Sequence, residues 1–235
     1  MAYKRTRGTP NGDGSSAVTP TRTGPHDEAV ALSLGLGRGT LAEEGSYFTA
    51  MNPTIATEIV GHVAPAIADE GTKSLLYVRN ASTTKYITID QLTLRVEVVN
   101  ASASDIYFSV VTVHNEVSRD SGGTAITPVN ARSDNPISSE ATIYFGAVIN
   151  TPSAFKLHSR ALMRQTINVT EDRYYFQFGG NMVPGPAYVA TISDIYRTLP
   201  PLVLAPGGEM LFCEVNPSGA ATASTYEFLL GYWER

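Results

Sequence analysis

Residues 226–235 (YEFLLGYWER) restrict the fold of this chain more than any other stretch. In an extended strand, four large apolar side chains share one face: Tyr226, Phe228, Leu230 and Tyr232. Leu229 and Trp233 lie on the other face. A strand that is apolar on both faces is either central in a sandwich or covered by a neighbouring subunit. We therefore expect a central strand of a β-sandwich, with Trp233 contributing to contacts between subunits.

The chain from residue 46 onward reads as short strands separated by turn signals. Apolar alternation predicts strands at 47–53, 75–79, 86–100, 105–117, 141–149, 155–168, 173–178, 188–196, 202–204, 209–215 and 226–235. The alternation within 86–100 changes phase at Asp90 and Gln91, which predicts a β-bulge. Such a succession of short strands without a long amphipathic helix indicates an all-β fold. We expect an antiparallel β-sandwich with jelly-roll or Greek-key connections and an extended N-terminal arm.

Residues 1–45 have a different composition and are predicted to be that arm, while 46–235 form the sandwich domain. The arm is rich in Gly, Ser, Thr and Pro, and such a segment cannot bury enough apolar surface to order itself. Leu32, Leu34 and Leu36 form its one apolar patch, which suits docking on a neighbouring subunit. The alternative is an arm folded back over its own sandwich.

Four residues near the N-terminus form the strongest basic cluster: Tyr3, Lys4, Arg5 and Arg7. The cluster suits contact either with nucleic acid enclosed in a protein shell or with an acidic neighbouring protein. Three cations give only weak affinity for nucleic acid at physiological salt, and the whole chain has a net charge of -5. We therefore favour a protein partner over nucleic acid.

No catalytic or cofactor motif stands out in the sequence. The glycines at 35, 37 and 39 have neither a preceding strand nor a following helix in our reading, so they do not predict a phosphate site. The four histidines are isolated, and the single cysteine, Cys213, lies in an apolar run and reads as a buried small hydrophobe. We expect no enzyme activity, no cofactor and no metal.

Lys156, His158 and Arg160 alternate with apolar residues along the predicted strand 155–168. This pattern places the three basic side chains on one face, which we interpret as solvated or facing a partner. No apolar run approaches the roughly 18 residues of a membrane span, and the first residues lack the apolar stretch of a secretory signal. We expect that the protein does not associate with membranes and that it is made in a reducing compartment.

Four segments resemble a group of tailed-bacteriophage virion proteins: 45–54 (GSYFTAMNPT), 124–130 (TAITPVN), 204–211 (LAPGGEML) and 228–235 (FLLGYWER). The resemblance covers about residues 45–235, and the Gly-Tyr-Trp-Glu-Arg ending is its most specific part. It implies a structural virion protein of the kind that decorates capsids, a jelly-roll decoration (cement) protein that bridges major-capsid subunits.

The resemblance implies a protein made in the host cytoplasm and incorporated into the virion, with the major capsid protein or other virion proteins as partners. We expect a homo-oligomer, with a trimer favoured. The alternative is a tail-fibre or receptor-binding module that holds host glycans, for which Tyr174, Tyr188 and Tyr196 would supply aromatic platforms. Tyrosines in strands are more often core or interface residues. A glycan hydrolase on the same fold is a third reading, but the sequence nominates no pair of carboxylates for it.

Overall fold

The computed structural model divides the chain into two compact units, Met1–Gly39 and Thr40–Arg235. It describes residues 22–23, 29–30, 38–54, 59–60, 74–98, 106–114, 123–146, 156–164, 172–180, 188–189, 192–215 and 225–235. In the first unit, β1 (Arg22–Thr23) pairs antiparallel with β2 (Ala29–Val30). The second unit contains the two sheets in which the remaining strands pair.

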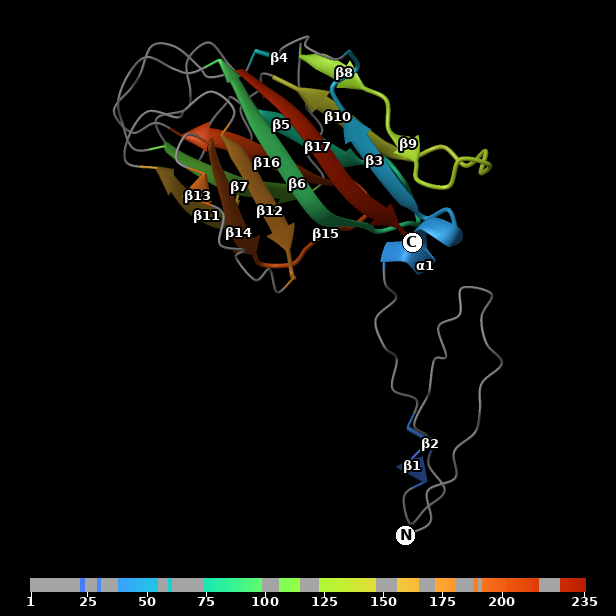
Figure 1. Cartoon of the computed structure of the whole chain (residues 1–235). Coiled ribbons are helices and arrows are strands. Elements are labelled where there is room, and N and C mark those ends of the chain that lie inside the picture. Colours follow the sequence, from blue (N-terminus) through green and yellow to red (C-terminus); the bar gives the residue numbers. More distant parts are fainter. Residues whose placement is uncertain are drawn as a thin grey trace. The chain divides into compact units, whose positions relative to one another are not determined.

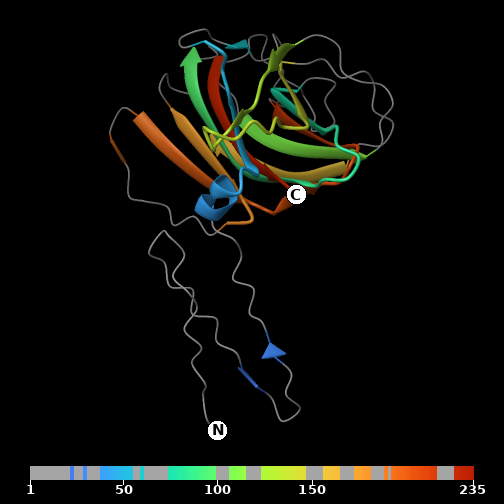
Figure 2. The ribbon, with the colours of Figure 1, turned by 90° about the vertical axis from the view of Figure 1, so that its right-hand side faces the viewer.

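Two packed sheets confirm the all-β sandwich expected from the sequence (Figure 1 and Figure 2). Across the six-stranded sheet lie β11 (Lys156–Arg164), β7 (Ile106–His114), β16 (Gly208–Val215), β5 (Leu76–Asn80), β10 (Ala141–Phe145) and β8 (Thr124–Ile126). Across the nine-stranded sheet lie β13 (Tyr188–Val189), β14 (Ile192–Leu199), β12 (Arg173–Phe178), β6 (Ile87–Val98), β17 (Thr225–Glu234), β3 (Tyr47–Met51) and β9 (Val129–Asn130). Two short strands complete this sheet, β15 (Leu202–Leu204) beside β6 and β4 (Ile59–Val60) beside β17.

Strand β17 is central, as the apolar pattern on its two faces predicts. It pairs antiparallel with β6 along one edge and with β3 along the other. Its inward side chains are buried between the sheets: Phe228 stacks on Phe145 at 4.9 Å between ring centroids, and Tyr232 stacks on Phe48 at 5.8 Å. Burying aromatic rings from both sheets against one strand ties the two layers together.

Aromatic rings also dominate the other end of the core. The ring centroid of Phe108, in the six-stranded sheet, lies 5.5 Å from the ring centroids of both Tyr174 and Phe176, in the nine-stranded sheet. It also stacks on Phe212 at 5.2 Å. A second apolar cluster covers the opposite face of the six-stranded sheet and consists of Tyr77, Val111, Leu211, Cys213 and Val215. The buried position of Cys213 confirms its reading as a small hydrophobe.

The bulge predicted in β6 lies at Asp90. The pairing of β6 with β17 advances from Gln91 opposite Gly231 to Ile89 opposite Tyr232, so Asp90 is the extra residue of the bulge. Its buried carboxylate accepts a hydrogen bond from the Tyr47 hydroxyl at 2.8 Å. The change of phase lets apolar residues before and after the bulge face the same core.

The region after β12 differs from the sequence prediction. The expected single strand at 188–196 is two strands, β13 and β14, which form an antiparallel pair with Tyr188 opposite Ser193. Because β14 reverses direction relative to β13, it runs parallel to β12, so one pair departs from the expected antiparallel pattern. No Gly, Pro, Asn or Asp marks the break between Val189 and Ile192, and the jelly-roll connectivity stays a prediction.

Strand β11 also differs from prediction, because a bulge at His158 changes its phase. Leu157 pairs with Val111, and Ser159 already pairs with Val110. Arg160, opposite Ser109, therefore shares the face of Leu157 and not the side of Lys156. The three basic residues do not form one continuous face.

Other elements of the structure, among them a short helix and two short strands, were not predicted from the sequence. A short helix, α1 (Arg38–Glu43), begins within the glycine-rich segment at 35–39, where we expected none. Its only buried residue is Leu41, which anchors the turn before β3. Strands β8 and β9 lie within the polar stretch 124–136, because pairing with β10 and β3 supplies the hydrogen bonds that local sequence does not indicate.

Candidate interaction surface

The outer face of the nine-stranded sheet carries a broad band in which the exposed side chains are uncharged, while the Asp90 carboxylate within it is buried. Alternation places these residues opposite the core: Thr49, Met51, Thr88, Gln91, Thr93, Val129, Tyr175, Gln177, Tyr196, Thr198, Val203, Leu229, Gly231 and Trp233. We call this set the uncharged band. Met51, Val129 and Val203 expose 51%, 60% and 53% of their surface. Such exposure of large apolar side chains on one face of a sheet marks a surface suited to a partner.

Trp233 lies in the uncharged band, on the face where the sequence placed it. It is half-buried, and it lies opposite Thr88 of β6 and Tyr47 of β3. The other partner-binding residues proposed from the sequence lie outside the described residues: Tyr3, Lys4, Arg5, Arg7, Leu32, Leu34 and Leu36. Their contacts with a neighbour stay a prediction.

Two half-buried tyrosines stack on each other within the band. The rings of Tyr175 and Tyr196 lie 4.6 Å apart with an interplanar angle of 10°. Tyr174, which we considered as a glycan platform, is fully buried in the core and has no surface to offer. The side chain of Tyr188 lies outside the described residues. The sequence did not single out Tyr175, although its alternation with the core residues Tyr174 and Phe176 places it on the outer face.

One edge of the band is formed by charged residues that pair with one another. The Arg95 guanidinium lies 2.9 Å from a Glu97 carboxylate oxygen and 3.2 Å from one of Glu227. This cluster on β6 and β17 marks where the uncharged surface ends. Partner contact across the band therefore requires little desolvation of charge.

A buried carboxylate fixes the end of β17 beneath this surface. Glu234 accepts hydrogen bonds from the Ser139 hydroxyl at 2.5 Å and from the backbone N–H of Glu140 at 3.0 Å. Lys85 lies 2.6 Å from Glu140 and 3.8 Å from Glu234. Its ammonium lowers the pKa of the Glu140 carboxyl, and that carboxylate in turn raises the pKa of Lys85. These contacts hold Trp233, the residue before Glu234, in a fixed position.

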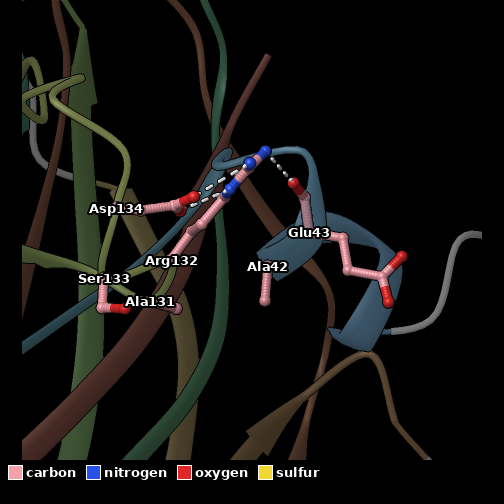
Figure 3. Close-up of a pocket in the computed structure, with 6 residues that line it drawn as sticks. All are labelled: Ala42, Glu43, Ala131, Arg132, Ser133 and Asp134. Atoms are coloured by element: carbon pink, nitrogen blue, oxygen red, sulfur yellow. Dashed lines mark hydrogen bonds and ion pairs between the residues drawn. The ribbon is translucent and has the colours of Figure 1, made fainter.

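A shallow pocket of about 510 Å³ lies between α1 and the loop after β9 (Figure 3). The Arg132 guanidinium donates to both oxygens of Asp134, at 2.7 and 3.2 Å, and to the backbone carbonyl of Glu43 at 2.8 Å. The hydrogen bond from Arg132 is the largest cause of the lowered pKa of Asp134. The charged groups satisfy one another, so this pocket serves to attach the helix to the loop.

Glu214 is a buried carboxyl group that the sequence analysis did not single out. It follows Met210 and Phe212 in the inward alternation of β16 and exposes only 5% of its surface. Burial raises the pKa of Glu214 to about 7, and a hydrogen bond with Tyr226 offsets part of that effect. A buried acid among apolar rings affects the stability of the fold, because burial disfavours its charged form.

No family model, curated protein or solved structure matches this chain. In the part of the chain that the structure describes, no three potential metal ligands cluster. Within the same part, no helix is both long and apolar enough to cross a membrane.

Proposed function

We propose that this protein is a structural component of a tailed-bacteriophage virion, a capsid decoration (cement) protein that bridges major-capsid subunits. The uncharged band is the observation that carries the proposal. Interface cores are depleted of charge and enriched in aromatic residues and Met, which is the composition of this band. The resemblance of segments 45–54 and 228–235 to virion proteins gives the kind of assembly.

In the proposed mechanism, the protein binds the surface of the capsid through many weak contacts. Copies of the sandwich associate as a homo-oligomer, a trimer being favoured, through the uncharged band around Trp233. The N-terminal arm of each copy lies across a neighbouring capsid subunit. Each additional contact raises the avidity of the whole oligomer without requiring any strong single contact.

The proposal is tested by placing charge in the band. Met51→Lys and Val129→Glu change exposed side chains, so the fold should be retained. We expect each variant to bind undecorated heads at least tenfold more weakly than wild type, because a charge inside an interface must be desolvated. Sedimentation of heads with bound protein measures this.

The matched control is Ile137→Glu, which changes a side chain that is 50% exposed on the loop outside the band. It should bind as wild type does. Equal binding by all three variants would remove the band from the proposal, and failure of the wild-type protein to bind heads would refute the decoration role.

A second candidate function is glycan recognition by a tail-fibre module, favoured by the Tyr175–Tyr196 stack. Gln177 and Thr198 lie next to these rings on the same face and offer the uncharged donors and acceptors that neutral sugars require. The number of copies per virion separates the two roles: hundreds for decoration and a few tens at most for a fibre. Binding to a glycan array that is lost in Tyr196→Ala would favour the fibre module.

A further inference from the structure

A groove of about 490 Å³ runs along the free edge of β15. Five consecutive residues line it, from Pro201 to Ala205. Alternate side chains of a strand point to opposite faces, so five in a row border one cavity only along the backbone edge. The other edge of β15 pairs with β6, its only partner among the strands that the structure describes. The Leu204 carbonyl accepts a hydrogen bond from the Asn80 side chain, and the Ala205 carbonyl accepts one from the Gly208 N–H. The remaining backbone groups of this edge are those that the groove presents to an incoming chain.

The opposite wall of the groove comes from the six-stranded sheet. Lys156 and His158 of β11 line it together with Thr112, Val113 and Glu209. The bulge in β11 leaves His158 without a partner in β7 and brings its Nε2 within 3.4 Å of the Pro200 carbonyl oxygen. Bulges commonly re-aim one side chain in this way. The groove is thus bounded by a strand edge on one side and by two basic side chains on the other.

The groove contains one ammonium group, that of Lys156, which no described acid pairs with. Glu209, its one acidic lining residue, lies 3.4 Å from Arg79. Lys156 is exposed and has no acidic partner among the described residues. Five other described cations do have one: Arg79, Lys85, Arg95, Arg132 and Arg235. In a chain of net charge -5, a free ammonium beside a strand edge favours an acidic ligand.

We propose that this groove binds an extended acidic segment of another protein chain. The segment adds to β15 as a strand and places a carboxylate on the Lys156 ammonium. Strand addition draws its affinity from backbone hydrogen bonds and its selectivity from alternate side chains. Pro201 and Pro206 flank β15, and since proline donates no N–H, the pairing is limited to this short strand. The groove would take such a segment whether or not the protein belongs to a virion.

The test uses the full chain and a fluorescein-labelled peptide in which valine alternates with glutamate. Fluorescence anisotropy should show binding, and the same peptide with lysine in place of glutamate should bind at least tenfold more weakly. Lys156→Glu should weaken binding of the glutamate peptide by roughly fivefold to tenfold at low salt, because an attraction becomes a repulsion. An N-methylated glutamate peptide should lose binding, since it cannot pair with β15.

The matched control is Arg173→Glu, which reverses an exposed charge on β12, outside the groove. It should leave peptide binding unchanged, and thermal unfolding should show that both variants remain folded. Absence of binding by the glutamate peptide overturns the proposal. Equal affinity for the lysine peptide, or an equal loss in Arg173→Glu, overturns the assignment of Lys156. Undiminished binding of the N-methylated peptide overturns strand addition.

Discussion

Replacing Glu214 with glutamine should change how the stability of this protein depends on pH. The carboxyl lies in the core beside Tyr226, where burial raises its pKa from 4.5 to about 7. The folded protein therefore holds a proton at this site that the unfolded chain has released. Its contribution is fully favourable below the unfolded pKa and is lost as the pH rises through about 7.

The magnitude follows from the size of the shift. Each pKa unit corresponds to about 1.4 kcal/mol, so the penalty above the folded pKa approaches about 3 kcal/mol. Most of it, more than about 2 kcal/mol, should develop between about pH 5 and about pH 8. Glutamine keeps the shape of the protonated acid and does not titrate, so Glu214→Gln removes this dependence.

Urea unfolding of both proteins at several pH values measures the effect. The difference in free energy of unfolding, variant minus wild type, should increase in favour of the variant as the pH rises. All other titrating groups are common to the two proteins and cancel in this difference. A difference that is constant across the pH range would show that the site is solvated and that the reasoning about burial is wrong.

Three further outcomes are expected. A Cβ at Gly231 would overlap the Tyr47 hydroxyl, so Gly231→Ala should lower the free energy of unfolding, measured in urea, by about 1 to 3 kcal/mol. The control is Gly39→Ala, whose added Cβ meets no atom within 4 Å. Equal stability of the two variants would contradict the close approach of Tyr47 to Gly231. Glu234→Ala removes the carboxylate that accepts hydrogen bonds from the Ser139 hydroxyl and the Glu140 N–H, and should lower the free energy of unfolding by about 2 to 4 kcal/mol. An unchanged stability in calorimetry would show that these hydrogen bonds do not stabilise the fold. Deleting residues 1–37 keeps α1 whole and should leave a folded protein that no longer binds heads; full decoration by the truncated protein would refute the arm model.

Much of the fold could be predicted from the sequence because its signals are local. The period-two pattern of residues 226–235 indicated that β17 is central, and the change of phase near Asp90 located the bulge. The same alternation in β16 carried a signal for Glu214, which follows Met210 and Phe212 on the inward face. These features need only the geometry of one strand, in which successive side chains point to opposite faces.

Only the tertiary structure decided which strands became neighbours. The uncharged band joins residues from Thr49 to Trp233, and the groove beside β15 joins Lys156 to Val203. The parallel pairing of β14 with β12 and the shift at His158 likewise had no local mark. Pairing depends on contacts between segments far apart in sequence, and a single strand's pattern does not specify which edge it will join or where its register will shift.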